Sequence, residues 1–216
     1  SGSGKSTLLK LIAGLLTPMS GSVSLEGEPI RRECARVSRL LSTKISMSFQ
    51  KGGLLDCFNA WENIDFALKE LTPFRASERK EIAFHALEQV GLLKAKENKL
   101  RELSGGMLKR LSLARTFALR PKLLLLDDPT AGLDPVTAEE IVSLIQSFCE
   151  ANRCLVVFTS SDLAVSFKLA SQLVFLWDGT LSKLHTVQEF KKSNDPAIEQ
   201  FTQGSLTGPL TQTVYA

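Results

Sequence analysis

The sequence has no apolar run that approaches the about 18 to 20 residues needed to cross a lipid bilayer. It has no block of like charge either, because its 26 basic and 23 acidic residues are scattered and give a formal net charge of +3. Charge therefore gives no reason to expect nucleic acid as a partner. Its first residues, SGSGKST, do not have the pattern of a signal peptide. We expect a cytosolic protein that reaches membranes only through a partner.

Cysteine is scarce and its spacing carries no motif. The four cysteines show neither CxxC nor CxxH spacing and stand at Cys34, Cys57, Cys149 and Cys154. This excludes the usual zinc patterns and gives no sign of a disulfide framework. We therefore expect the protein to reside in a reducing, cytosolic environment. With 216 residues and 44% hydrophobic content, the chain is long enough to bury a hydrophobic core without disulfides or a structural metal.

Glycine, lysine and hydroxyl side chains open the chain in the order of a phosphate-binding loop. The candidate nucleotide-binding residues are Ser1, Gly2, Ser3, Gly4, Lys5, Ser6 and Thr7. Apolar residues then recur at helical spacing from Leu8 to Leu16, so the loop would lead into a helix N-terminus that binds phosphates. In such a loop the lysine approaches the β and γ phosphates, and the hydroxyl of Ser6 can ligate Mg²⁺. Without that helix, the same residues would indicate a flexible Gly/Ser segment.

A complete loop of the form GxxxxGK[ST] has a further glycine five residues before Gly4, and a strand before that glycine. Both would precede Ser1. We therefore expect the chain to be truncated within its first motif, with the N-terminal strands of the fold missing.

Hydrophobic periodicity along the rest of the chain predicts an α/β protein with a helical insertion. The expected helices are residues 60–71, 76–93, 105–119, 135–151 and 162–170. The expected strands are a short pair in 20–27 that turns at Gly27, and then 45–50, 122–128, 154–160 and 172–179. Segments 122–128, 154–160 and 172–179 are apolar runs of the kind buried on both faces of a parallel sheet. Residues 31–44 allow no firm assignment, and the tail from Asp195 is expected to be extended.

Two adjacent carboxylates, Asp127 and Asp128, end the most apolar of these strands. After an isolated strand, such a pair would most simply cap a helix or form a turn. Downstream of a phosphate loop it predicts the second half of a nucleotide site. Asp127 would then hold Mg²⁺, and Asp128 would orient the attacking water.

The segment ELSGGMLKRLSLARTFALRPKLLLLDDPTAGLDP resembles the ATP-binding cassette (ABC) ATPases over its whole length. LSGGM at 103–107 resembles their signature motif, the Asp127–Asp128 pair their Walker B carboxylates, and residues 131–134 their D-loop. The resemblance covers nearly the whole chain. It implies a P-loop NTPase fold with a RecA-like parallel-sheet core, a small antiparallel β part and a helical subdomain.

The resemblance also implies how the chain is divided. We expect a single ABC ATPase domain over 1–216, a helical subdomain inserted at about 54–103, and a C-terminal extension over 195–216. The histidines His85 and His185 match no family motif, and both are most simply surface residues.

The resemblance further implies a site shared between two subunits. The γ-phosphate of ATP bound to the opposite subunit would be contacted at a helix start by Ser104, Gly105 and Gly106. Asp134 of the D-loop belongs to the same set of nucleotide-binding residues. Gln50 matches the Q-loop glutamine, which touches Mg²⁺ and water and relays closure to a membrane partner. Outside this pattern, Gln50 would be an ordinary exposed residue at a strand end. The implied cofactors are ATP and Mg²⁺, with Ser6, Gln50 and Asp127 around the metal.

Several stretches are similar to the ATPase subunits of MCE-type phospholipid transporters, the Mla group. These are the methionine of LSGGM, the stretch QKGGLLDCFNAWENI, the loop DDPTAGLDP and the tail DPAIEQFTQGSLTGPL. The resemblance implies a homodimer or heterodimer of ATPase subunits, a multispan permease and an MCE lipid-binding protein. It places the chain in the cytoplasm, peripheral on the cytoplasmic face of the inner membrane. By the same resemblance the tail would reach the second subunit; otherwise it is a disordered terminus.

Two positions depart from the family pattern. The second Walker B carboxylate is usually glutamate, and Asp128 is one methylene shorter. Ser161 stands where the family has its switch histidine. Because a misplacement of about 1 Å can cost on the order of 100-fold in rate, we expect nucleotide binding to survive and hydrolysis to be attenuated.

Three functions remain open from the sequence. The first is an ATPase subunit that drives lipid or other transport, with Asp128, Gln50 and Ser161 at the catalytic positions. The second is a hydrolysis-impaired ATP-binding clamp that regulates an ABC complex. The third is a soluble ABC protein of translation or DNA repair, which usually carries two cassettes in one chain or large insertions.

Overall fold

The computed structural model describes residues 2–25, 27–29 and 44–212, which divide into two compact units. The larger unit runs from Lys5 to Ser160, and the smaller one combines the residues up to Gly4 with the segment from Ser161 onward. Ser1 and residues 30–43 lie outside the described residues, and with them all of the unassigned stretch 31–44 except Lys44. Each unit is described separately below.

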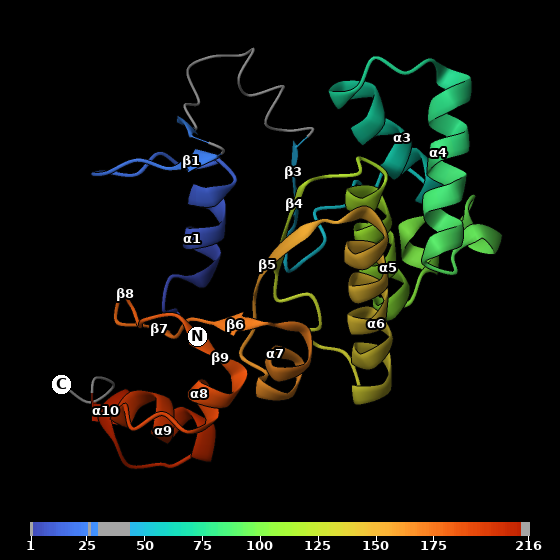
Figure 1. Ribbon diagram of the computed structural model, residues 1–216. Coiled ribbons are helices and arrows are strands. Elements are labelled where there is room, and N and C mark those ends of the chain that lie inside the picture. The colour runs from blue at the N-terminus through green and yellow to red at the C-terminus, as the bar shows by residue number, and fades with distance from the viewer. Residues whose placement is uncertain (1, 26, 30–43, 213–216) are drawn as a thin grey trace. The chain divides into compact units, whose positions relative to one another are not determined.

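A parallel sheet forms the centre of the larger unit (Figure 1). Its strands are β3 (Ile45–Ser48), β4 (Leu123–Asp127) and β5 (Leu155–Thr159), in the order β3-β4-β5. The register aligns Ile45 with Leu123 and Leu123 with Leu155. Parallel pairing therefore brings the carboxyl ends of all three strands to one edge, where ligands bind in open α/β sheets.

The central strand β4 is buried along its whole length, as its unbroken leucines predict. On one face, Leu123 and Leu125 pack against Leu9 of helix α1 (Lys5–Ile12) and against Ile45. Figure 1 shows α1 on one side of the sheet and the helices α5 (Gly105–Phe117) and α6 (Pro135–Asn152) on the other. Removing any of the buried leucines would cost about 2 to 5 kcal/mol.

The expectation that β5 is also buried on both faces is wrong. Leu155 is 65% exposed, and the other residues of the strand are only partly buried. Among the described strands, β5 lies at the end of the sheet order, so only β4 has a hydrogen-bonded neighbour on each side. An apolar run predicts a strand, but it does not say how central that strand is.

A short antiparallel pair precedes the sheet. Strands β1 (Ser24–Leu25) and β2 (Glu28–Pro29) pair across a turn in which Gly27 has φ +83°. The turn at Gly27 is where it was predicted, but the second strand lies beyond the predicted range of 20–27. Glycine suits the turn because positive φ costs it little.

The helical insertion contains α3 (Ala60–Leu71) and α4 (Ala76–Gln89), followed by two 3₁₀ turns, η1 (Leu93–Ala95) and η2 (Leu100–Glu102). Asn59 caps α3 in a capping box with Glu62, which accounts for the sharp start of this helix. The prediction that α4 continues to residue 93 is wrong. The chain leaves the helix at Val90, because Gly91 takes φ +71° and ends it.

The smaller unit begins with α7 (Leu163–Leu169) and contains two short antiparallel pairs. β6 (Gln172–Leu173) pairs with β9 (His185–Thr186), and β7 (Leu176–Trp177) pairs with β8 (Thr180–Leu181). The prediction of one buried parallel strand over 172–179 is therefore wrong. The turn at Asp178 and Gly179, with φ of +48° and +69°, sends the chain back as a two-residue hairpin.

The tail is helical, which corrects the expected extended extension. It contains α8 (Val187–Lys191), α9 (Pro196–Gln203) and α10 (Pro209–Gln212). Asp195 caps α9 by accepting from the amides of Ala197 and Ile198, with a proline at the first helical position. Gly204 then ends the helix in the left-handed region.

The buried Gln200 joins α9 to α10. Its Oε1 accepts a hydrogen bond from the amide of Leu210 at 2.7 Å, and its Nε2 donates to the carbonyl of Ser205 at 3.1 Å.

The expectation that both histidines lie on the surface is wrong for His185. This residue is only 4% exposed, and its ring packs edge-to-face on Phe190. His85 is on the surface as predicted.

Candidate functional site

The phosphate-loop residues lead directly into α1. Gly2 and Gly4 have φ of +79° and +97°, which only glycine adopts without strain. Lys5, Ser6 and Thr7 form the first turn of α1. The amides of a helix's first turn have no partner within their own helix, and its dipole favours a negative charge there. The local structure is thus that of an anion-binding helix start.

The hydroxyl of Ser6 lies against the carboxylate at the end of β4. Ser6 Oγ donates to Asp127 Oδ1 at 3.0 Å, and Thr159 Oγ1, at the end of β5, donates to the same oxygen at 2.8 Å. Asp127 itself is 7% exposed. The structure therefore brings two residues that the sequence predicts as metal ligands together at one edge of the sheet, although 121 positions separate them.

The backbone of Asp128 is held in an unusual conformation. Its φ is +47°, a left-handed value that a non-glycine residue adopts only at some cost. Its amide donates to the carbonyl of Thr159 at 3.0 Å and lies 3.3 Å from the Thr159 hydroxyl. Its carbonyl accepts from the amide of Ala131 at 3.2 Å. Thr159 thus contacts the carboxylate of Asp127 and the backbone amide of Asp128, a role that sequence reasoning missed.

Lys109, on the second turn of α5, was also missed. Its ammonium donates to the carbonyl of Gln50 at 2.6 Å and to the carbonyl of Asp128 at 3.3 Å. Burial lowers the pKa of Lys109, and the charges of Asp128 and Asp127 act in the opposite direction. The one signal in the sequence was a lysine in the turn after LSGG, and no local pattern says what such a residue contacts.

The signature residues lie at the start of α5. Ser104 is the N-cap, and its hydroxyl accepts from the amide of Met107 at 3.3 Å. Ser104 and Gly105 are exposed, and Gly106 is half-buried. A Cβ on Gly106 would lie 2.9 Å from Cγ2 of Thr137, so α5 and α6 approach each other at a glycine. The start of α5 is therefore exposed, while Gly106 is the point where α5 and α6 approach.

Asp134 caps the start of α6. Its carboxylate accepts from the amides of Val136 and Thr137, each at 3.0 Å, and from the Thr137 hydroxyl at 2.6 Å. These hydrogen bonds, led by that from the hydroxyl, lower the pKa of Asp134. Asp134 is exposed, and Thr137, which donates to it, lies next to Gly106 of the signature helix.

Ser161, predicted at the switch position, is exposed and belongs to the smaller unit. It directly precedes Asp162, which caps α7 by accepting from the amides of Ala164 and Val165. Ser161 therefore lies one residue before the N-cap of α7, the helix that follows β5 in the sequence.

The oxygen donors around Asp127 suit a hard divalent cation. No group of three or more histidine, cysteine, aspartate or glutamate residues with metal-site geometry occurs in the described ranges. Mg²⁺ characteristically binds through one or two carboxylates together with substrate phosphates and water. One hydroxyl and one buried carboxylate 3.0 Å apart fit that requirement when a nucleotide supplies the remaining oxygens.

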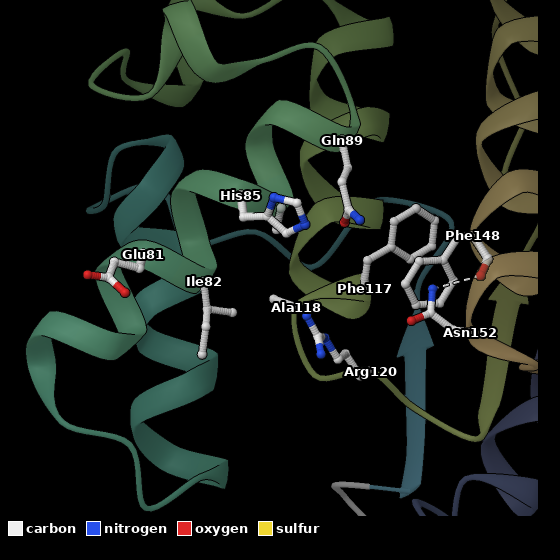
Figure 2. Close-up of a pocket in the computed structure, with 10 residues that line it drawn as sticks. Glu81, Ile82, His85, Gln89, Phe117, Ala118, Arg120, Phe148 and Asn152 are labelled. Carbon is white, nitrogen blue, oxygen red and sulfur yellow. Dashed lines mark hydrogen bonds between the residues drawn. The ribbon is translucent and has the colours of Figure 1, made fainter.

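A hollow of about 250 Å³ lies elsewhere in the larger unit (Figure 2). Figure 2 shows it between α4, which contributes His85 and Gln89, and the ends of α5 and α6. Phe117 and Phe148 stack at its rim with ring centroids 3.9 Å apart. Because Phe117 ends the helix that Ser104 starts, the hollow is about 20 Å along α5 from the signature residues. It is separate from the nucleotide chemistry.

None of the described helices is both long and apolar enough to span a membrane.

Comparison with known proteins supports this geometry. The sequence model of the ABC transporter family matches residues 1–131. The chain is 35% identical to the chloroplastic protein TRIGALACTOSYLDIACYLGLYCEROL 3 of Arabidopsis thaliana, over 97% of this chain and 65% of that protein. It is 34% identical to the intermembrane phospholipid transport system ATP-binding protein MlaF of Escherichia coli K12, over 97% of this chain and 78% of MlaF.

Transport proteins with other named substrates are similar as well. The bicarbonate transport ATP-binding protein CmpD of Synechococcus elongatus is 35% identical over 85% of this chain and 64% of CmpD. The chain thus spans about two thirds of the length of some of its relatives.

The solved structures agree with the fold. The ATP-binding cassette MJ0796, in a dimeric post-hydrolysis state bound to ADP and Pi, superposes with a TM-score of 0.77 at 29% identity, over 86% of this chain and 82% of that one. The fold is therefore the α/β P-loop NTPase fold of the ABC ATPases. With a family match over more than half of its length and relatives above 30% identity, this chain belongs to the ABC transporter family.

Proposed function

We propose that this chain binds and hydrolyses ATP to drive phospholipid transport of the MCE type, through a permease at the cytoplasmic face of a membrane. The observation that carries the nucleotide part is the contact between Ser6 on the phosphate-loop helix and Asp127 at the end of β4. The lipid part is supported by the similarity to MlaF over 97% of the chain.

Each group at the sheet edge has a task that follows from its chemistry. The helix start and Lys5 bind the phosphates of ATP. Ser6 and Asp127, with Gln50, would hold Mg²⁺, which shields the charge of the phosphates when bound. Asp128 orients water for attack on the γ-phosphate, and Thr159 keeps the Asp128 backbone in place.

The second half of each site comes from a second copy in this proposal. Ser104 and Gly105 are exposed at a helix start, where amides and the dipole attract phosphate. Their exposure within one chain is what a site closed by a partner requires. The dimeric state of the similar cassette MJ0796 supports the same arrangement.

A specific pair of residues favours a second function. Asp128 has a short carboxylate on a backbone that its hydrogen bonds hold in place, and Ser161 has no imidazole to offer a γ-phosphate. If the two together prevent turnover, the chain is an ATP-dependent clamp that changes shape without hydrolysing its nucleotide. The two functions share every binding contact and differ only in the chemical step.

One experiment separates these functions and the transported substrates. The full-length protein would be reconstituted with its permease in proteoliposomes, and ATP hydrolysis and movement of a fluorescent phospholipid would be measured together. We expect Mg-ATP to drive both. If the complex transports bicarbonate but moves no phospholipid, the lipid substrate is contradicted. If the complex binds ATP without hydrolysing it, the clamp function is established.

A further inference from the structure

Three side chains on one face of α5 donate hydrogen bonds to consecutive parts of the Q-loop backbone. Lys109 donates to the Gln50 carbonyl at 2.6 Å. Ser112 donates to the Gly52 carbonyl at 3.1 Å, and Arg115 donates to the carbonyls of Gly52 and Gly53, each at 2.7 Å. The donors stand at intervals of three residues, which places them on one side of the helix.

The Q-loop accepts this row of donors because of its glycines. Gly52 and Gly53 have φ of +76° and +58°, and the Gly52 amide donates to the Phe49 carbonyl at 2.7 Å. The resulting tight turn presents its carbonyls to α5. Three of the four bonds come from a positive charge, and such bonds are about twice as strong as neutral ones.

Lys109 differs from Ser112 and Arg115 because it also donates to a residue at the end of β4. Its ammonium also reaches the carbonyl of Asp128, so one side chain bridges the ends of β3 and β4. A left-handed non-glycine residue costs on the order of 1 to 3 kcal/mol and persists only where its surroundings fix it. At Asp128 those surroundings include the hydrogen bonds that its backbone makes with Thr159, Ala131 and Lys109.

We propose that Lys109 is a positioning residue of the ATPase site, which ties the signature helix to Gln50 and Asp128 of the same subunit. Lys109 is five residues beyond Ser104, about 7.5 Å along the helix axis. A displacement of the helix start, when it engages nucleotide on a second subunit, is thereby passed to the two residues that contact water. The inference rests on the proposed ATPase function and adds a residue to it.

The first test separates binding from turnover in the full-length protein with its permease. Lys109→Met keeps an unbranched side chain but removes the donor. We expect its ATP dissociation constant to stay within about twofold, because the bridge does not contact phosphate, while kcat falls by about tenfold or more, since misplacement by 1 Å can cost 100-fold. Lys109→Arg, which can donate to two carbonyls, restores most of kcat. The control is Lys69→Met, a matched change at an exposed lysine on α3.

The second test does not depend on turnover. Amide hydrogen exchange of residues 51–53 is compared with and without ATP, while light scattering follows dimer formation. We expect ATP to change the protection of this segment in the wild type and to leave it unchanged in Lys109→Met, although the variant still dimerises.

The outcomes are distinct. An ATP-induced change in Lys109→Met equal to that of the wild type, or an unaltered kcat, would overturn the role of Lys109 and leave the ATPase function intact. A wild type that neither dimerises nor hydrolyses ATP would overturn both.

Discussion

Ser6 and Asp127 lie 121 positions apart and share a hydrogen bond of 3.0 Å, which joins the start of α1 to the end of β4. The parallel register makes the contact possible, because the carboxyl ends of β3, β4 and β5 meet at one edge. The start of α1, which packs on β4, is brought to that edge. The nucleotide site thus follows from the topology of the sheet.

The first prediction concerns the phosphate loop. Lys5→Ala in the full-length protein should weaken ATP binding severely, because Lys5 supplies the loop's side-chain cation for the phosphates. The control is Lys10→Ala in the last turn of the same helix, which should leave affinity unchanged. Isothermal titration calorimetry measures both. Equal affinities for the two variants would remove the assignment of the loop.

The second prediction concerns assembly. Ser104→Arg should leave the chain folded and able to bind ATP while abolishing ATP-dependent dimerisation, because a bulky cation replaces a small hydroxyl at the exposed start of α5. Ser143→Arg, the same change at an exposed serine of α6, is the control. Dimer formation is followed by light scattering. An ATP-induced dimer of Ser104→Arg would argue against a site closed by the signature motif.

The third prediction concerns the contact between α5 and α6. Gly106→Ala should lower the free energy of unfolding by about 1 to 3 kcal/mol, because the new Cβ would lie 2.9 Å from Cγ2 of Thr137. Gly105→Ala, where nothing lies within 4 Å of the added atom, should cost nothing. Urea denaturation followed by circular dichroism gives both values.

A double variant identifies the cause of that loss. Thr137→Ser removes Cγ2 and retains the hydroxyl that donates to Asp134. Gly106→Ala with Thr137→Ser should therefore recover most of the lost stability. A double variant as unstable as Gly106→Ala alone would place the strain elsewhere.

The fourth prediction concerns thiol reactivity. Burial, with a smaller contribution from the neighbouring Cys154, raises the pKa of Cys149 to about 12. At pH 8 its thiolate fraction is about one part in 10,000, and the thiolate is the reactive form. Iodoacetamide should therefore modify the exposed Cys57 well before Cys149, as read by peptide mass spectrometry. The difference should vanish in urea, and equal rates in the folded protein would contradict it.

Local signals in the sequence located most of the larger unit. Hydrophobic periodicity predicted a helix over 60–71 and the run of leucines predicted a strand over 122–128, and α3 and β4 lie there. The smaller unit was missed in part because apolar spacing cannot show the reversal at Asp178 and Gly179. The helix α9 could have been read from its capping aspartate, proline and final glycine, which the absence of long periodicity obscured.

For the site, sequence motifs predict the residues that contact the nucleotide. The residues that position them are seen only in the tertiary structure. Ser6 and Asp127 were predicted to work together, and the structure brings them into contact. Thr159 and Lys109 were not predicted, because each acts through a neighbour that is distant in the sequence. Hydrogen bonds of this kind leave no local pattern.

The last prediction returns to the two residues that depart from the family pattern, Asp128 and Ser161. Asp128→Glu extends the carboxylate by one methylene, and Ser161→His supplies the imidazole of the family's switch position. Both groups act on water and developing charge more than on bound ATP, so turnover should rise while affinity stays the same. Phosphate release by the full-length protein with its permease measures the first quantity, and calorimetry measures the second. The family resemblance implies that both side chains serve one reacting centre, and on that basis the double variant should exceed either single one by a non-additive factor. A wild type that already turns over at about 1 to 100 per second, with no gain from either change, would show that Asp128 is long enough. A double variant that binds Mg-ATP and stays inactive would instead favour the clamp, because restoring both groups would then have restored no chemistry.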